Sequence, residues 1–212
     1  LEFRRVLFRS RLIPVVQEVC KHVAIPVSVD TTKAALAEEA IAAGATIIND
    51  ISALQADPAM AAVAARTGSG LVLMHMQGTP QTMQQAPRYE DVVGDVRDFL
   101  RARLAAAARA GIAEDHVVLD PGIGFGKNLE HNLTLLSRLD ELLALGRPLL
   151  VGVSRKAFIG EVLGRTTAER IWGTAAAVAV AVLKGARIVR VHDVTAMRDV
   201  VKMVRAIHEA RD

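Results

Sequence analysis

The stretch Val117-Val118-Leu119-Asp120-Pro121-Gly122-Ile123-Gly124-Phe125-Gly126-Lys127 begins as an apolar run, meets an acidic residue and continues as a glycine-rich segment. The apolar run is too short for a core helix and is typical of a buried strand. Five further short apolar runs also end in polar residues. Their ends read Ser28-Val29-Asp30, Ile48-Asn49-Asp50, Met74-His75, Val153-Ser154-Arg155-Lys156 and Arg190-Val191-His192-Asp193. Because parallel α/β barrels carry their chemistry at the C-terminal ends of the strands, these six ends are candidates for one functional face.

Alanine-rich stretches with helical periodicity separate the six runs, which predicts an α/β protein with a parallel sheet. We expect strands near 25–30, 45–50, 70–75, 116–120, 149–154 and 187–192, and helices near 33–43, 57–66, 89–110, 129–144, 166–184 and 195–209. The predicted helix ends are marked by Gly44, Gly68, Gly111, Gly146 and Gly185, in the position favoured for a C-terminal cap. Six βα units fit either an open doubly wound sheet or an eight-stranded barrel that lacks two units, and periodicity leaves both open.

The composition excludes several classes of protein. A chain of 212 residues with 51% hydrophobic residues can fill the core of one domain. Aromatic residues make up only 3%, which argues against a stacking surface for single-stranded nucleic acid. The net charge of +3 comes from residues 1–11, with four Arg and one Glu; the rest carries 22 basic and 22 acidic residues. We therefore expect neither a nucleic acid nor a membrane as partner.

Cysteine usage and hydropathy bear on the location of the protein. The chain has one cysteine, Cys20, so no internal disulfide is possible, which fits a cytoplasmic protein. No apolar stretch reaches the roughly 18 residues of a membrane span. Residues 1–11 have charges that interrupt every apolar run, so they are predicted to be neither a signal peptide nor a clear helix.

The first polar ends have structural as well as functional interpretations. Asp30 could cap the following helix, or face the barrel mouth as a carboxylate. Asn49 and Asp50 could serve a turn, and Asn49 could also offer a donor and an acceptor to a heteroaromatic ring. The segment 120–127 fits neither the phosphate loop of nucleotide triphosphatases nor the dinucleotide fingerprint, because its glycines have the wrong spacing.

The later polar ends carry cations. Arg155 and Lys156 could simply be solvated. Arg190 and His192 share one face of a predicted strand, where an arginine is costly unless paired. They could form a clamp for an oxyanion or phosphate, or Arg190 could form a salt bridge to Asp193 or to a neighbouring strand. The polar stretch 77–88, with two prolines, is predicted to be a long loop and a candidate lid.

The other histidines, His22, His116, His131 and His208, are expected at the surface, and no spacing of His, Cys and Asp suggests a tight metal site.

Taken together and in this order, the segments resemble dihydropteroate synthase from about Arg11 to the end. The matching segments are SVDTTK, IINDIS, LVLMHMQGTP, VVLDPGIGFGK, LLVGVSRKAFIGEVLG and RIWGTAAAVAVAVLKGARIVRVHDV. The resemblance implies a TIM (β/α)8 barrel, a homodimer and a transferase of folate biosynthesis. Such an enzyme condenses 6-hydroxymethyl-7,8-dihydropterin pyrophosphate with p-aminobenzoate, giving 7,8-dihydropteroate and pyrophosphate. It is a sulfonamide target and uses Mg²⁺ together with the substrate pyrophosphate.

The resemblance also implies roles for individual residues. The pterin would contact Asp30, Asn49, Ile51, Met74, Asp120, Phe125 and Lys156. Among these, Asp30, Asp120 and Lys156 would be catalytic, with buried carboxylates at Asp30 and Asp120 stabilising the cation that develops as pyrophosphate leaves. Phe125, Ser154 and Lys156 would border p-aminobenzoate, and Arg190 and His192 would hold the pyrophosphate. No metal ligand is expected in this chain.

The start of the chain departs from the family pattern. We expect residues 1–10 to be a non-native junction and residues 11–212 to be a partial pterin-binding barrel domain that lacks the first two strands. The family's asparagine ligand for magnesium-pyrophosphate and its Thr-Arg-Pro loop over p-aminobenzoate would lie in the missing part. Two alternatives stay open: a pterin-binding methyltetrahydrofolate methyltransferase, and a fragment that binds pterin without catalysis.

Overall fold

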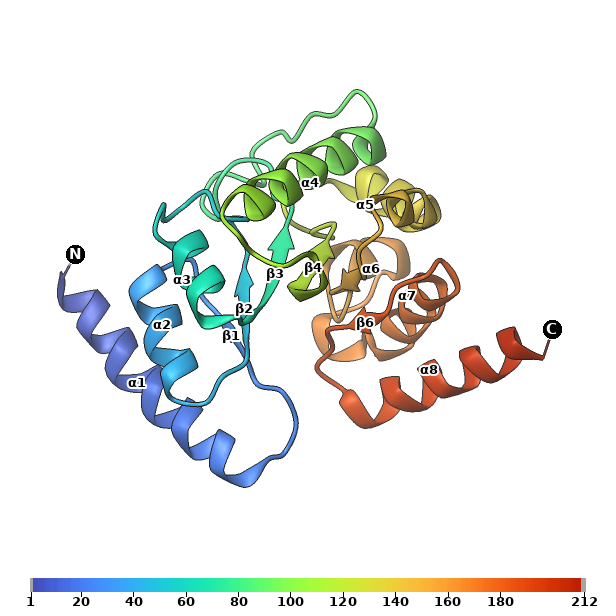
Figure 1. Ribbon diagram of the computed structural model, residues 1–212. Helices are drawn as coiled ribbons and strands as arrows, with labels where there is room; N and C mark the ends of the chain where they lie inside the picture. The colour runs from blue at the N-terminus through green and yellow to red at the C-terminus, as the bar shows by residue number, and fades with distance from the viewer. Residues whose placement is uncertain (1, 211–212) are drawn as a thin grey trace. The chain divides into compact units, whose positions relative to one another are not determined.

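The computed structural model describes residues 2–210 and shows the expected alternation of helices and parallel strands (Figure 1). The strands are β1 Ser28–Asp30, β2 Ile47–Asp50, β3 Gly70–Met74, β4 Val117–Asp120, β5 Leu150–Val151 and β6 Ile188–Val189. The α-helices are α1 Glu2–His22, α2 Ala34–Ala42, α3 Met60–Thr67, α4 Val92–Arg109, α5 Leu129–Ser137, α6 Ala157–Leu163, α7 Ile171–Leu183 and α8 Val194–Glu209. The 3₁₀ helices are η1 Glu114–His116, η2 Leu139–Leu145 and η3 Thr167–Glu169.

The strand order identifies the fold as part of a barrel. One sheet has the order β1-β2-β3-β4 and the other pairs β5 with β6, and a parallel bridge joins Leu119 to Leu149. Strands that follow one another in the chain are therefore neighbours, as in a (β/α)8 barrel, whereas a doubly wound sheet reverses its order at a switch point. The six βα units form a partial barrel, and no closed barrel is present among the described residues.

Two compact units make up the chain, the first of residues up to 74 with 102–118, the second of residues 75–101 with 119–212. The first unit packs α1 on α2 through Val16, which is buried with Val29, Ala40 and Ala45. The prediction that residues 1–11 form no clear helix is wrong, because α1 runs from Glu2 to His22. The proposed junction over residues 1–10 stays a prediction, and its Leu1 lies outside the described residues.

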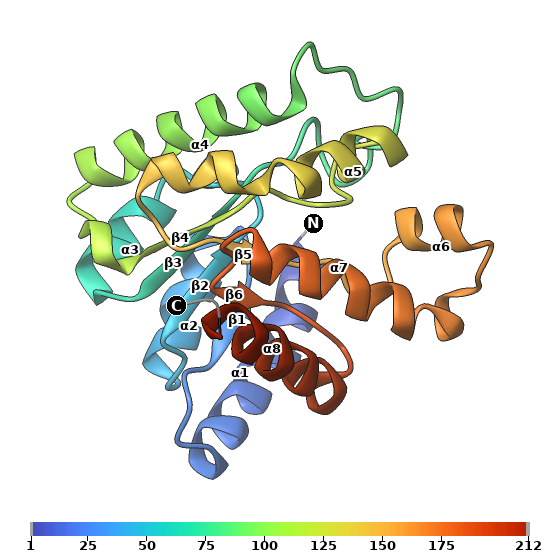
Figure 2. The ribbon, with the colours of Figure 1, turned by 90° about the vertical axis from the view of Figure 1, so that its right-hand side faces the viewer.

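The second unit buries the large apolar side chains of α5, η2 and the strands that follow, and α8 packs along α7 (Figure 2). Two predicted helices are each divided: 129–144 becomes α5 and η2, and 166–184 becomes η3 and α7. The helix α6 was not predicted. All five glycines expected at helix ends have positive φ, from 64° at Gly68 to 112° at Gly44.

Candidate active site

In the first unit, Asp30 and Asn49 face each other in register at the ends of β1 and β2. Asn49 Nδ2 donates a hydrogen bond to Asp30 Oδ1 at 2.5 Å. The other atom of the amide, Oδ1, is buried and is the one side-chain polar atom among the described residues that is buried without a hydrogen-bond partner. A buried acceptor without a donor is costly in free energy. The pair therefore presents an acceptor suited to a polar ligand.

Two expectations for this pair need correction. Asp30 is exposed, so it is not the buried carboxylate that we expected. It also does not cap the next helix, because α2 has Lys33 at its N-cap.

Asp50, next to Asn49, is fully buried and serves the turn that follows β2. Its carboxylate accepts hydrogen bonds from the Ser52 amide and hydroxyl and from the Leu54 amide. The turn interpretation is therefore correct for Asp50. Of the predicted apolar contacts in this unit, Met74 is buried and Ile51 is half-buried.

In the second unit, the glycine-rich loop 122–126 is held by side chains from outside it. Lys127 Nζ donates to the carbonyls of Gly122 and Phe125, and Lys156 Nζ donates to that of Ile123. The remaining two carbonyls, of Gly124 and Gly126, accept from Gln84 Nε2 and Tyr89 Oη. All five consecutive carbonyls thus accept a side-chain hydrogen bond.

Close approach explains two of the loop glycines. A Cβ on Gly124, which has φ +81°, would lie 2.9 Å from Lys156 Cδ. A Cβ on Gly126, which has φ +61°, would lie 2.6 Å from the carbonyl oxygen of Gln77. Both positions require the backbone freedom and the small size of glycine.

Gln84 and Gln77 belong to the stretch 77–88 that was predicted to be a long loop. The Gln77 side chain donates to the carbonyl of Arg88 and accepts from its amide, which closes the base of the loop. Gln84 connects the middle of the loop to Gly124. The long loop is confirmed, and a lid function stays a prediction.

Asp120 is buried at the end of β4, where three cations surround it. Burial raises the pKa of its carboxyl group, while Lys156, the Gly122 amide, Lys127 and Arg190 oppose that rise. Lys156 lies over the Phe125 ring at 4.5 Å, and burial lowers the pKa of its ammonium to about 8. The expectation that Lys156 could simply be solvated is wrong. Asp120 and Lys156 form a charged, partly dehydrated site in which electrostatic interactions are strong.

Arg190 and His192 lie beyond the end of β6, and both are exposed. The argument from a costly buried arginine is therefore wrong, because the strand ends at Val189. His192 Nδ1 lies 2.9 Å from Ser154 Oγ, which also accepts from the His192 amide. Asp193 pairs with Arg155, with Arg155 Nη2 at 2.6 Å from Asp193 Oδ1.

Two buried residues were not among the predicted site residues. Lys127 was considered only as part of a phosphate loop, and His75 only as the polar end of a strand. Lys127 Nζ and His75 Nδ1 lie 3.0 Å apart, both side chains almost completely buried. A lysine directly after three alternating glycines is the signal that could have been followed. Of the histidines expected at the surface, His22, His116 and His208 are exposed, but His131 is half-buried and takes part in the capping box of α5.

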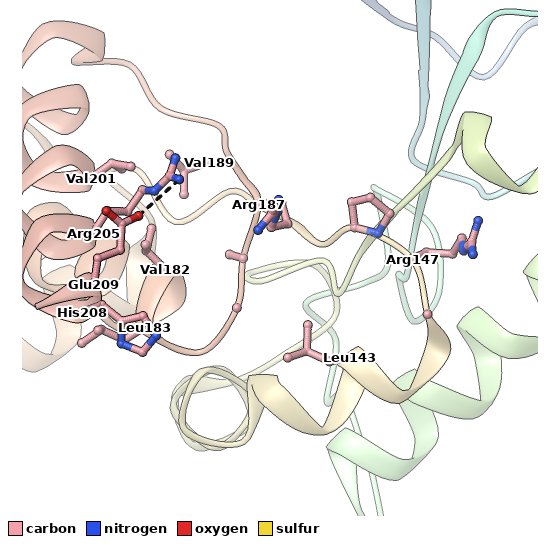
Figure 3. A pocket seen from close by; sticks show the side chains of 14 residues that line it. Leu143, Arg147, Val182, Leu183, Arg187, Val189, Val201, Arg205, His208 and Glu209 are labelled. Carbon is pink, nitrogen blue, oxygen red and sulfur yellow. Dashed lines mark ion pairs between the residues drawn. The ribbon is translucent and has the colours of Figure 1, made fainter. Parts of the chain in front are cut away.

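A cavity of about 720 Å³ lies elsewhere in this unit (Figure 3). Residues that precede β5 and β6 line it, among them Arg147 and Arg187, together with Arg205, which pairs with Glu209. It lies at the N-terminal ends of these strands and includes none of the predicted site residues. The candidate active site is therefore at the opposite ends of the strands.

Residues 9–192 match the family described as pterin binding enzyme. The chain is 46% identical over 199 residues to the dihydropteroate synthase of Synechocystis sp., covering 93% of this chain and 69% of that protein. A Yersinia pestis dihydropteroate synthase with a sulfonamide drug complex is 43% identical, with a TM-score of 0.92, covering 95% of this chain and 73% of that one. The chain belongs to the dihydropteroate synthase family. Its members are transferases, so the predicted family and enzyme type are confirmed.

A third similar structure is dihydropteroate synthase from Xanthomonas albilineans in complex with 7,8-dihydropteroate. It is 42% identical with a TM-score of 0.88, and the match covers 94% of this chain and 71% of that one. These dihydropteroate synthase relatives do not favour the methyltransferase alternative. None of the helices in residues 2–210 has both the length and the apolar character needed to cross a membrane.

Proposed function

We propose that this chain catalyses the dihydropteroate synthase reaction on 6-hydroxymethyl-7,8-dihydropterin pyrophosphate and p-aminobenzoate. The observation that carries the proposal is the buried Asp120 carboxylate with Lys156 close by. In the reaction the bond between the pterin methylene carbon and the pyrophosphate oxygen breaks, which leaves a cation delocalised into the ring. The amine of p-aminobenzoate then forms the new C–N bond and loses a proton. No protein nucleophile is needed.

For the pterin, we propose contacts with Asp30, Asn49, Asp120 and Lys156, with Ile51, Met74 and Phe125 as apolar neighbours. Asn49 Oδ1 would accept a hydrogen bond from a ring N–H, which would satisfy its buried acceptor. Asp30 and Asp120 would face the developing positive charge. The buried Asp120 would stabilise it the more strongly, because a fixed carboxylate in a site with little water interacts strongly with such a charge. Lys156 would donate to a ring acceptor.

For p-aminobenzoate, we propose Phe125, Ser154 and Lys156, which the second unit holds on two loops. For the pyrophosphate, we propose Arg190 and His192. An exposed guanidinium can bind phosphate oxygens in a two-point geometry. Ser154 connects the proposed p-aminobenzoate residues to the proposed pyrophosphate residues through its contact with His192.

The described residues do not fit a protein-bound magnesium site. They include no group of three His, Cys, Asp or Glu side chains that could hold a metal ion. We propose that Mg²⁺ enters with the substrate pyrophosphate, whose charge it neutralises.

We propose that the complete protein acts as a homodimer in the cytoplasm. The helices α7 and α8 expose large apolar side chains, including Trp172, Leu183, Met203 and Ile207. Sedimentation analysis should give twice the mass of the chain, and Ile207→Lys should shift it to the monomer. A monomer in the unsubstituted protein would contradict the proposal.

Calorimetric titration with a pterin analogue, beside an assay of dihydropteroate formation with Mg²⁺, tests the proposed function. Asp120→Asn should abolish binding, while Asp140→Asn, which changes an exposed carboxylate paired with Lys184, should leave it unchanged. Equal binding by the Asp120→Asn protein would refute the role of Asp120. Absence of any pterin binding by the unsubstituted chain would refute the proposed function for it.

A further inference from the structure

Lys127 and His75 are buried, hydrogen-bonded to each other and without a role in the reaction as described above. Lys127 is 3% exposed and His75 is 6% exposed. His75 directly follows β3, and its amide donates to the carbonyl of Asp120, the last residue of β4, at 2.9 Å. Lys127 lies at the end of the glycine-rich loop that follows Asp120. The pair is therefore next to Asp120, the residue that carries the proposed chemistry.

The three hydrogen-bond donors of the Lys127 ammonium match three acceptors. These are His75 Nδ1, the Gly122 carbonyl and the Phe125 carbonyl, each 3.0 Å from Nζ. A lysine has three N–H donors, so this set satisfies it completely. A buried lysine that directs two of its three donors at carbonyls of one loop, and the third at a fixed acceptor outside it, is placed to hold that loop.

His75 is suited to accept from a cation. Burial, reinforced by the charge of Lys127, lowers the pKa of His75 to about 3, so its imidazole is neutral near neutral pH. The ring of Phe99 packs edge-on against it with centroids 4.9 Å apart. A neutral ring fixed by packing can keep Nδ1 directed at Lys127.

The loop that Lys127 holds has little structure of its own. Gly122, Gly124 and Gly126 all have positive φ, and glycine has the largest conformational freedom of any residue. The same loop contacts Lys156 twice, through the Ile123 carbonyl and the Phe125 ring. A change in the conformation of the loop would therefore displace the side chain of Lys156.

We propose that Lys127 is a positioning residue: supported by His75, it fixes the carbonyls of Gly122 and Phe125 so that the loop holds Lys156 and Phe125 in place for the substrate. Lys127 does not contact the substrate itself, because its donors are used by the loop and by His75 and its side chain is buried. This role rests on the proposed function of Lys156 and Phe125.

The test compares Lys127→Met, which keeps the length of the side chain but removes the donors, with Lys184→Met as control. Lys184 forms an exposed ion pair with Asp140 and does not contact the loop. The first measurement is hydrogen–deuterium exchange of residues 122–126 without ligand, and the second is the affinity for a pterin analogue over a range of pH.

Lys127→Met should speed hydrogen exchange of the loop amides and weaken binding of the pterin analogue by about tenfold. Lys184→Met should change neither the exchange rate nor the affinity. The pH dependence separates positioning from a general loss of structure. Asp120 faces Lys127, Lys156 and Arg190, and the charge of Lys127 opposes the rise of the Asp120 pKa. In Lys127→Met the loss of affinity at acidic pH should therefore begin at higher pH than in the unsubstituted protein. A general structural defect would lower the affinity without moving this pH dependence.

Unchanged loop exchange in a folded Lys127→Met protein would overturn the proposal, as would unchanged affinity together with an unchanged pH profile. If this variant does not fold, His75→Phe keeps the ring packing and removes only the acceptor for Lys127. It should show the same changes to a smaller extent, and exchange like that of the unsubstituted protein would overturn the proposal. The exchange measurement needs no ligand, so a failure of the proposed function, seen as absent pterin binding, is distinguished from a failure of the role of Lys127.

Discussion

The guanidinium of Arg155 forms a two-point ion pair with the carboxylate of Asp193, which joins the loop after β5 to the loop after β6. Nε lies 3.1 Å from Oδ2 and Nη2 lies 2.6 Å from Oδ1. Arg155 has a φ of +57°, which is unfavourable for a residue with a side chain. Its amide donates to Thr174 Oγ1, and Arg170 Nη1 donates to its carbonyl. The ion pair and these bonds together hold the turn that carries Ser154 and Lys156.

Substitution of Arg155 by Lys tests this connection. A lysine keeps the charge but cannot form the two-point contact, so the two loops should lose their fixed spacing. We expect about tenfold weaker binding of inorganic pyrophosphate in calorimetric titration. Arg165→Lys, which alters an exposed pair with Glu169, is the matched control. Unchanged pyrophosphate affinity in Arg155→Lys would show that the pair is dispensable for the anion site.

Lys156 should make pterin binding sensitive to alkaline pH. Its pKa of about 8 means that the ammonium is lost well below the 10.5 of a free lysine. Affinity for a pterin analogue should therefore fall with a midpoint near pH 8, and Lys156→Arg should remove this alkaline loss, because arginine stays protonated.

Unfolding cannot explain that loss. Between about pH 8 and 10.5 the unfolded chain binds more protons at Lys156 than the folded chain, so this group makes the folded state more stable as the pH rises. Melting temperatures measured across the same range should not fall on account of Lys156. An alkaline loss of affinity that persists in Lys156→Arg would assign it to another group.

His75 should reduce stability in acid. Its folded pKa of about 3 lies below the unfolded value of 6.5, so the unfolded chain binds more protons between these limits. The stability associated with neutral His75 is complete above pH 6.5 and is lost as the pH falls toward 3. At pH 5 the loss amounts to about 2 kcal/mol.

Denaturant unfolding of the unsubstituted protein and of His75→Asn checks this difference. His75→Asn lacks the imidazole, so only the unsubstituted protein loses the stability that is linked to protonation of His75. The difference in unfolding free energy between the two proteins should therefore narrow below pH 6.5. Burial raises the pKa of Asp120, which has the opposite effect in acid, and it is present in both proteins. A gap that stays constant from pH 7 to pH 5 would contradict the expectation.

Asn49 should be more important for binding than for stability. Asn49→Leu removes a buried acceptor that lacks a partner, and this offsets the lost hydrogen bond to Asp30, so the unfolding free energy should change by less than about 1 kcal/mol. Pterin affinity should fall by about tenfold or more.

Asn132 is the control, because it is buried and fully engaged. It accepts from the Gly124 amide and donates to the Asn128 carbonyl. Asn132→Leu should cost about 2 kcal/mol or more of unfolding free energy, measured by denaturant titration. A larger loss of unfolding free energy in Asn49→Leu than in Asn132→Leu would show that Asn49 serves stability and would contradict the prediction.

Local sequence predicted the order of the elements well, and failed where longer-range contacts decide. The strand before Arg190 was expected over 187–192, but β6 holds only Ile188 and Val189, because ladder hydrogen bonds end where the partner strand ends at Val151. The helix α1 was missed at its start, since charged residues interrupt every apolar run there and leave no clear periodic signal. The helix α6 is one short segment of seven residues, too brief for a periodic signal.

The sequence by itself determined the order of the strands and the polar residues that follow them, where glycine is needed, and to which family the chain belongs, since these depend on local pattern and motif. Only the tertiary structure decided which polar ends are buried. Asp120 and Lys127 are enclosed, whereas Asp30, Arg190 and His192 are exposed. It also decided the partners, pairing Arg155 with Asp193 and Lys127 with His75 across 38 and 52 positions of the chain. The physical reason is that burial and pairing depend on the packing of segments distant in sequence, and these set the pKa of each group and the orientation of each side chain.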